Sequence, residues 1–155
     1  MLNLLCGMIA SGKSTLCHKL AQNNWLIIND DSIVNALHGN NYTLYNKKLK
    51  PLYKLIENTM INGCVLMGVD AVIDRTCLSK EMRSRYITLA KTLDVPIICT
   101  VFPVESPEIH AHRRCNHDNR GHKYEYWLKV AQSHLATYEP PSLDEGFQEI
   151  VKYAL

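Results

Sequence analysis

A segment near the start of the chain has the residue types and spacing of a phosphate-binding loop. Gly7-Met8-Ile9-Ala10-Ser11-Gly12-Lys13-Ser14-Thr15 fits the complete pattern GxxxxGK followed by Ser or Thr. The two glycines let the backbone turn inward, so that successive N–H groups point at one phosphate. The ammonium group of Lys13 suits the β- and γ-phosphates, and the Ser14 hydroxyl suits Mg²⁺. A chance glycine-rich loop is the alternative. The pattern predicts a nucleoside triphosphate as ligand and does not by itself define a reaction.

Two carboxylates follow apolar segments further along the chain. Asp30 comes after Trp25–Ile28, and Asp74 closes Val69–Ile73. The carboxyl ends of strands beside a phosphate loop are where an open α/β sheet meets its ligands. There Asp30 could take the proton of an acceptor hydroxyl, and Asp74 could hold Mg²⁺ through water. The simpler alternatives are a helix cap at Asp30 and Asp31 and a turn residue at Asp74.

A basic segment at residues 113–123 has the composition of a mobile lid. It carries four lysine or arginine side chains and one carboxylate, and Gly121 offers a hinge. Arg114 and Arg120 would neutralise the phosphates when the lid closes and excludes water. A solvated basic loop is the alternative. The residues expected to contact the nucleotide are Gly7, Ala10, Ser11, Gly12, Lys13, Ser14, Thr15, Arg114 and Arg120.

Two other clusters have simple explanations beside functional ones. One could form a zinc site on paper, but its spacing matches no closed site and its positive neighbours would repel the metal; its members are His110, His112, Cys115 and His117. The second interleaves tyrosines with lysines, which suits a single nucleic-acid strand, although an exposed helix face with partly buried tyrosines is the simpler explanation. Its members are Tyr42, Tyr45, Lys47, Lys48, Lys50, Tyr53 and Lys54.

Strand and helix patterns alternate along the chain, and this alternation must position the polar residues. We expect strands at Leu2–Cys6, Trp25–Ile28, Val69–Ile73, Pro96–Phe102 and Phe147–Val151. We expect helices at Lys13–Gln22, Ser32–Leu37, Lys48–Met67, Ser79–Leu93, Pro107–Cys115 and Tyr124–Tyr138. The apolar face expected for the long central helix is Leu49, Leu52, Leu55, Ile56 and Met60. The alternation predicts an α/β fold with a five-stranded, mainly parallel sheet and helices on both faces.

Length and composition fit one globular domain spanning residues 1–155. Hydrophobic residues make up 46% and charged residues 21%, which argues against a disordered or fibrous chain. No apolar run reaches the roughly 18 residues of a membrane span, and the first residues lack the basic region of a signal peptide. The net charge of +2 neither favours nor excludes nucleic acid. Six cysteines without CxxC spacing suggest reduced thiols, so the expected location is the cytoplasm, or the host cytoplasm if the protein is viral.

Among proteins with a phosphate loop, this chain has the features of a small kinase. A motor or AAA+ unit usually needs more chain, with a second subdomain or sensor elements. A GTPase would carry Asn-Lys-x-Asp, and Asn46-Lys47-Lys48 lacks the aspartate. A small kinase needs a base, a carboxylate near Mg²⁺ and a basic lid, and candidates for all three are present.

Several further motifs carry a family resemblance over nearly the whole chain. They are Ile28-Asn29-Asp30, Ile73-Asp74-Arg75-Thr76-Cys77, Arg83-Ser84-Arg85-Tyr86, Asn119-Arg120-Gly121, and the ending Glu139-Pro140-Pro141 with Glu145-Gly146-Phe147. With the phosphate loop, these motifs resemble those of the P-loop polynucleotide 5′-hydroxyl kinases, both the phage type and the kinase half of eukaryotic kinase–phosphatase repair enzymes. The resemblance implies a P-loop kinase fold, Asp30 as general base, and transfer from ATP or another triphosphate, with Mg²⁺, to a 5′-hydroxyl end of DNA or RNA.

The chain departs from this family where an acceptor phosphate would bind. The phage-type arginine three residues after the base is here Ile33, and the repair-type arginine before it is Asn29. Arg75 replaces the usual asparagine after Asp74, so we expect Arg75 to contact the phosphate on the 3′ side of the acceptor. A pairing of Arg75 with Asp74 or Asp70 is the alternative. No Asp-x-Asp-x-Thr phosphatase motif is present.

Two other functions stay open at this point. A small-molecule or tRNA-bound hydroxyl kinase would share every part except the acceptor groove. A nucleotide-binding regulator would keep the nucleotide site without transfer to an acceptor. DNA or RNA, single or double strand, donor base and oligomeric state are not specified by these residues.

Overall fold

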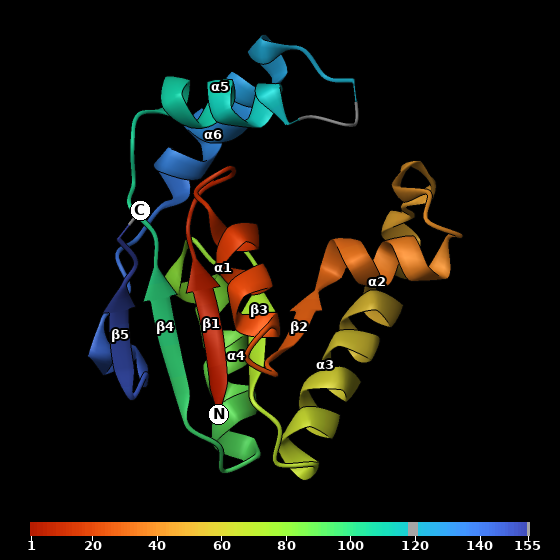
Figure 1. Cartoon of the computed structure of the whole chain (residues 1–155), viewed down its shortest axis with the longest axis vertical. Coiled ribbons are helices and arrows are strands. Elements are labelled where there is room, and N and C mark those ends of the chain that lie inside the picture. The colour runs from red at the N-terminus through yellow and green to blue at the C-terminus, as the bar shows by residue number, and fades with distance from the viewer. Residues whose placement is uncertain (118–120, 155) are drawn as a thin grey trace.

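The first strand of the chain lies at the centre of a five-stranded parallel sheet. The computed structural model describes residues 1–117 and 121–154. The strand order is β2-β3-β1-β4-β5 (Figure 1). The strands are β1 Leu2–Cys6, β2 Leu26–Asn29, β3 Ala71–Asp74, β4 Ile97–Val101 and β5 Glu149–Lys152. Parallel neighbours are joined by helical crossovers, as the alternating pattern predicted.

Helices cover both faces of this sheet and extend beyond its carboxyl edge. They are α1 Lys13–Ala21, α2 Asp30–Leu37, α3 Lys50–Leu66, α4 Lys80–Thr92, α5 Pro107–Asn116 and α6 Tyr124–Thr137. Side chains of α3 and α4 pack with Leu2, Leu4 and Ile73 on one face. Cys17 of α1 packs with Leu5 and Val72 on the other. The fold is therefore the three-layered α/β arrangement expected from the sequence.

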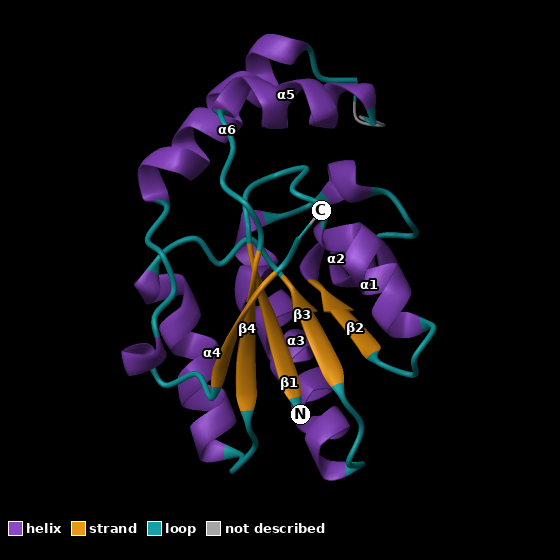
Figure 2. Ribbon diagram, turned by 60° about the vertical axis from the view of Figure 1, so that its left-hand side comes forward, coloured by secondary structure: helices purple, strands orange, loops and turns teal. Residues whose placement is uncertain are grey.

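The last two long helices lie apart from these layers. Helices α5 and α6 sit beyond the carboxyl ends of the strands, above the loop that joins β1 to α1 (Figure 2). Figure 1 shows the same relation from another side. We call this pair the α5–α6 hairpin. It contains the described part of the segment expected to be a lid.

The structure corrects the expected start of α2. Asp30 and Asp31 were expected to cap a helix that begins at Ser32, but the helix begins at Asp30. The cap is Asn29, whose side-chain oxygen accepts a hydrogen bond from the backbone N–H of Ser32 at 2.9 Å. Both aspartates thus lie in the first turn, where their charge stabilises the helix dipole.

The structure also corrects the expected apolar face of α3. Leu52, Leu55 and Met60 are 41%, 62% and 39% exposed. The buried residues of the helix are Tyr53, Glu57, Ile61 and Cys64. The face follows the i, i+4 spacing of this second set, and the mistake arose because a glutamate was not counted as a core position.

Two general properties bear on the environment of the chain. No helix in residues 1–117 and 121–154 is both long and apolar enough to cross a membrane. All six cysteines are free thiols, and Cys115 is half-buried while the other five are buried.

Candidate active site

A cleft of about 750 Å³ opens at the carboxyl edge of the sheet, between the phosphate loop and the α5–α6 hairpin. Residues from five separate segments line it. The β1–α1 segment contributes Ile9, Ala10, Ser11, Gly12, Lys13, Ser14 and Thr15, and the ends of β2 and β3 contribute Asn29, Asp30, Asp31, Asp74, Arg75 and Thr76. The hairpin contributes Arg113, Arg114, His117, Trp127, Val130 and His134. The residues after β1, β2 and β3 come together because the carboxyl ends of parallel strands meet at one edge, and the α5–α6 hairpin lies over that edge (Figure 2).

The phosphate loop has a backbone that only certain residues can adopt. Ala10 and Gly12 both have left-handed conformations, with φ of 51° and 96°. A Cβ atom at Gly7 would lie 2.6 Å from Ser11 Oγ and 2.8 Å from Phe102 Cβ, so glycine is required there. Helix α1 starts after Gly12 without a side-chain cap. Its first N–H groups therefore remain available to an anion in the cleft.

Lys13 is held inside the loop by its own backbone. Its ammonium group donates to the carbonyls of Gly7 at 3.0 Å and Met8 at 2.6 Å. Burial lowers the pKa of Lys13 to about 8, and the carboxylate of Asp74 opposes this shift. The lysine is thus desolvated in advance, which strengthens its attraction to a phosphate.

Asp74 is oriented by the residue that caps α2. The side-chain amide of Asn29 donates to Asp74 Oδ2 at 3.1 Å and to its backbone carbonyl at 3.3 Å. Asp74 and the exposed hydroxyl of Ser14 line the same cleft. Hydroxyl and carboxylate oxygens are ligands that Mg²⁺ prefers, and Mg²⁺ often keeps waters between itself and such groups. The donor set at this edge therefore fits Mg²⁺.

Asp30, which follows β2, forms an ion pair with Arg75, which follows the neighbouring strand β3. Burial raises the pKa of the Asp30 carboxyl, Arg75 opposes this, and the negative charges of Asp31 and Glu57 add to it. A carboxylate with a raised pKa is a better proton acceptor near neutral pH. Arg75 does not pair with Asp74 or Asp70, the alternative considered from the sequence; its partners are Asp30 and Glu57.

The α5–α6 hairpin contacts the phosphate loop through a histidine that sequence reasoning did not identify. His134 Nδ1 of α6 accepts a hydrogen bond from the Ile9 N–H at 3.2 Å. Burial lowers the pKa of His134 to about 4, and the positive charge of Lys13 contributes. The imidazole is therefore neutral near pH 7 and can accept this bond. In the sequence, His134 lies eight residues after Tyr126 in an amphipathic helix. Nothing in that pattern predicts a contact with Ile9, which is distant in the sequence.

The two arginines at the end of α5 have local partners. Arg113 pairs with Glu105. The guanidinium of Arg114 lies over the Trp127 ring at 4.7 Å and donates to the His117 carbonyl at 3.3 Å. Both arginines line the cleft, so the hairpin brings positive charge to the side facing the phosphate loop.

Most of the expected site residues gather at one edge of the sheet. Every residue from Ala10 to Thr15 lines one cleft, together with Asp30, Asp74, Arg75 and Arg114. Gly7 lies beneath this lining at the turn of the loop. Arg120 lies outside the described residues. In the described residues, no group of three or more His, Cys, Asp or Glu side chains could hold a metal ion, and this covers the histidines of α5.

The motifs at residues 83–86 and 139–147 meet in a buried clamp. Arg83 is fully buried, and its Nε and Nη2 donate to Glu145 at 2.7 and 2.8 Å. Its Nη1 donates to the carbonyls of Cys77, Leu78 and Glu139 at 2.9 to 3.1 Å. The clamp thus joins α4 and the chain ending to the segment that follows Asp74.

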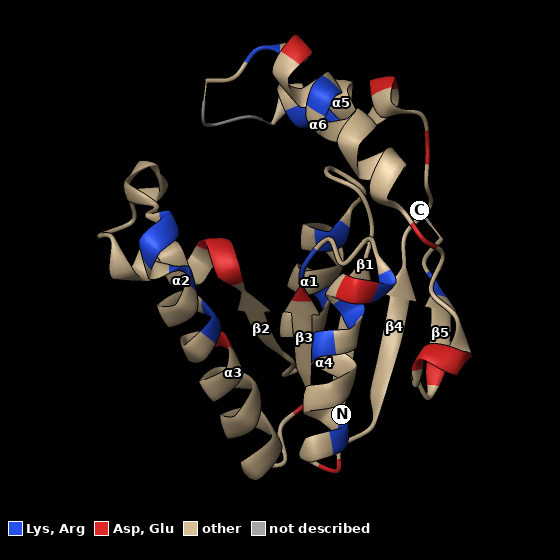
Figure 3. Cartoon of the chain, turned by 180° about the vertical axis from the view of Figure 1, so that it is seen from behind, with Lys and Arg blue, Asp and Glu red and all other residues tan. Residues whose placement is uncertain are grey.

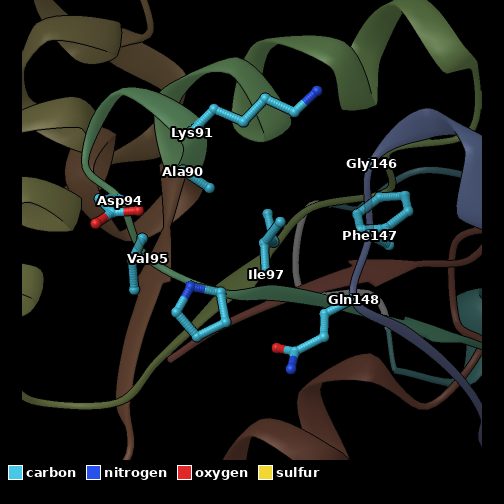
Figure 4. Close-up of a pocket in the computed structure, with 9 residues that line it drawn as sticks. Ala90, Lys91, Asp94, Val95, Ile97, Gly146, Phe147 and Gln148 are labelled. Atoms are coloured by element: carbon cyan, nitrogen blue, oxygen red, sulfur yellow. The ribbon is translucent and has the colours of Figure 1, made fainter.

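A second hollow of about 520 Å³ lies at the opposite end of the sheet, beneath the start of β4 (Figure 4). Ile97, Phe147 and Ala90 form its apolar part, and Lys91 and Asp94 lie on its border. None of the phosphate-loop residues lines it.

Comparisons with known proteins identify the family and the fold of the chain. A family model described as AAA domain (AAA_33) matches residues 2–141. No curated protein matches the chain. A candidate kinase from Chloroflexus aurantiacus has a similar structure, with 14% identity, a TM-score of 0.73, and coverage of 98% of this chain and 83% of the other.

Two further solved structures with similar folds come from different kinds of protein, an RNA repair complex and a gluconokinase. A chain of the Pnkp1/Rnl/Hen1 RNA repair complex shows 19% identity and a TM-score of 0.66, over 89% of this chain and 46% of the other. This chain thus spans less than half of that neighbour. A gluconokinase from Sinorhizobium meliloti shows 18% identity and a TM-score of 0.56, over 97% of this chain and 79% of the other. At these identities the likeness establishes the fold, which is that of P-loop kinases.

Proposed function

Because the chain belongs to the AAA-domain family (AAA_33) matched over residues 2–141, and its fold is that of P-loop kinases, we propose that it is an ATP-dependent polynucleotide 5′-hydroxyl kinase. The observation that carries the proposal is the shared cleft, in which Asp30 and Arg75 face the phosphate loop. A phosphate-binding half and an acceptor half with its own base are what phosphoryl transfer requires.

In the proposed reaction each of these groups has one role. The loop amides and Lys13 bind the triphosphate, and Ser14 and Asp74 would hold Mg²⁺, which draws negative charge from the phosphates when bound. Asp30 accepts the proton of the acceptor hydroxyl. The hydroxyl oxygen then bonds to the γ-phosphorus while the bond from that phosphorus to the leaving diphosphate breaks. Arg114 and Arg120 neutralise charge on the transferring group.

Arg75 is the local support for a polynucleotide acceptor. Arg75 contacts Asp30, the proposed base, directly. The phosphate on the 3′ side of the acceptor nucleotide would therefore lie near this guanidinium. Each terminal nitrogen of an arginine carries two N–H groups. The contacts to Asp30 and Glu57 use one N–H on each of these nitrogens, which leaves two donors for a phosphate. The RNA repair complex among the similar structures supports the same acceptor class.

One screen tests the proposal and its main alternative. Labelled γ-phosphate is offered with 5′-hydroxyl DNA and RNA oligonucleotides, nucleosides, gluconate and tRNA. We expect label on the oligonucleotides, and none when Asp30→Asn replaces the wild type, because the amide is nearly isosteric but cannot take the proton. Asp31→Asn is the matched control and should be mild. Label on gluconate or a nucleoside alone would instead favour a small-molecule kinase, and label on no acceptor would favour a regulator.

The role of Arg75 has its own comparison within this screen. Arg75→Ala should raise KM for an oligonucleotide and leave KM for ATP nearly unchanged. The loss should shrink for a nucleoside acceptor, which has no 3′ phosphate for the guanidinium to contact. Equal losses for both acceptors would mean that Arg75 serves only Asp30 or the fold.

A further inference from the structure

A buried carboxylate lies behind the acceptor half of the cleft. Glu57 of α3 is 1% exposed and is not among the residues that line the cleft. A buried carboxylate is costly unless cations and hydrogen-bond donors surround it. Glu57 has both, because Arg75 Nε lies 2.9 Å and Arg85 Nη2 2.7 Å from its oxygens, and the Tyr86 hydroxyl donates to it at 3.0 Å.

The cation that Glu57 holds is the one that contacts the proposed base. Arg75 uses Nε and Nη2 toward Glu57 and Nη1 toward Asp30. The Tyr86 hydroxyl also accepts from Arg75 Nε at 3.0 Å. Figure 3 shows acidic residues at the start of α2 and both signs of charge on the neighbouring α3. An arginine side chain is long and flexible, so a rigid partner on one edge fixes the direction of the other.

We propose that Glu57 is a positioning residue, whose carboxylate orients Arg75 so that the guanidinium meets both Asp30 and the acceptor. Glu57 does not reach the cleft, so its contact with the acceptor half runs through Arg75, and its charge acts on Asp30 from a distance. The inference rests on the proposed function, in which Asp30 is the base. Activity would then depend on a residue of α3 in addition to the phosphate loop and the strand ends.

The charges around Asp30 give this role a pH signature. They come from Arg75 at the end of β3, Asp31 in α2 and Glu57 in α3. Transfer needs the ionised carboxylate, so activity is lost as the pH falls through the pKa of Asp30. Replacing Glu57 with a neutral residue removes a negative charge near Asp30. Asp30 is then the one remaining carboxylate partner of Arg75 among the described residues. Both changes lower the pKa of Asp30 and move the acid limb of the activity profile to lower pH.

The test compares Glu57→Gln with Glu149→Gln in the full chain. The first variant keeps the size and one acceptor oxygen but loses the charge. The second makes the same charge change on exposed β5, at the far edge of the sheet from β2. The assays are kcat, KM for ATP and the pH profile of transfer, with thermal melts as a check on folding. We expect Glu57→Gln to move the acid limb down by about one pH unit and to lower kcat by about tenfold. KM for ATP should stay unchanged, and Glu149→Gln should match the wild type.

A double-variant comparison separates positioning from general stability. In an Arg75→Lys background, Glu57→Gln should add little further loss of kcat, because the path from Glu57 to Asp30 is already broken. Overlapping pH profiles of Glu57→Gln and wild type, or fully independent effects of the two changes, would overturn the proposal. So would a Glu57→Gln variant that does not fold, since Glu57 would then serve stability. A wild-type protein without transfer activity would instead show that the proposed function itself is wrong.

Discussion

Replacing Arg83 with methionine should destabilise the protein strongly without touching the cleft. Arg83 is fully buried and forms paired hydrogen bonds with Glu145. Methionine fills most of the volume, so the main effect is electrostatic. Glu145, whose side chain is only 7% exposed, would be left as a buried carboxylate without its cation, and three backbone carbonyls would each lose one donor.

The size of the effect follows from these contacts. Removing one partner of a buried ion pair costs about 3–5 kcal/mol, because the remaining charge stays desolvated. For a domain of this length, about 1 kcal/mol corresponds to about 2–4 °C in melting temperature. Arg83→Met should therefore lower Tm by about 10 °C at pH 7. Adding Glu145→Gln should recover part of this loss, since the uncompensated charge is removed while the carbonyls still lack the hydrogen bonds from Arg83.

Thermal melts followed by circular dichroism at several pH values test the reasoning. Although burial opposes it, hydrogen bonds from Arg83 hold the pKa of Glu145 below its usual value. The contribution of the pair is thus complete above the ordinary glutamate pKa and is lost as the pH falls through the lowered one. The gap in Tm between wild type and Arg83→Met should narrow at acidic pH. A loss of less than about 3 °C at pH 7 would refute the electrostatic account.

Three other outcomes are expected. Lys13→Ala should keep the melting transition and abolish transfer, because it removes the charge held at the γ-phosphate position; near-normal turnover would contradict the kinase assignment. Arg120→Ala should lower kcat more than ATP affinity, measured by steady-state kinetics and nucleotide titration, and Lys123→Ala should be mild; equal small effects would indicate an ordinary basic loop. As the pH is lowered from 6.5 to about 4, the free energy of unfolding of the wild type should decrease, because His134 binds a proton less readily in the folded protein than in the unfolded chain. Denaturant titrations should show a smaller decrease for His134→Gln, and the same pH dependence in both proteins would contradict this.

The sequence was most informative where local chemistry and chain order decide the structure. The phosphate loop is a local motif. A parallel sheet places the carboxyl ends of β2 and β3 at the same edge as this loop. Asp30, Asp74 and Lys13 therefore share a cleft, as expected. The cap at Asn29 was missed because asparagine and aspartate cap equally well, and one residue of register cannot be resolved by propensity alone.

The residues that sequence reasoning missed depend on packing between distant segments. Glu57 was hidden because a charged residue in a helix is normally taken as solvent-exposed. Its spacing of four residues from Tyr53 and from Ile61 was a usable signal, since it placed a carboxylate on the buried face. The contact of Arg75 with Glu57 could not be predicted, because Glu57 lies 18 residues away in sequence on a helix whose packing no local pattern encodes.

The central position of β1 also determines the order in which the protein can assemble. Leu2 pairs with Ala71 on one side and with Ile97 on the other. The phosphate loop follows β1 directly, so the loop is not fully supported until β3 and β4 have paired with β1. Closing such long loops costs chain entropy before the paired strands compensate it, and contacts of this range slow folding. During synthesis, β1 thus emerges before both of its neighbours and pairs fully only after β4 has been made.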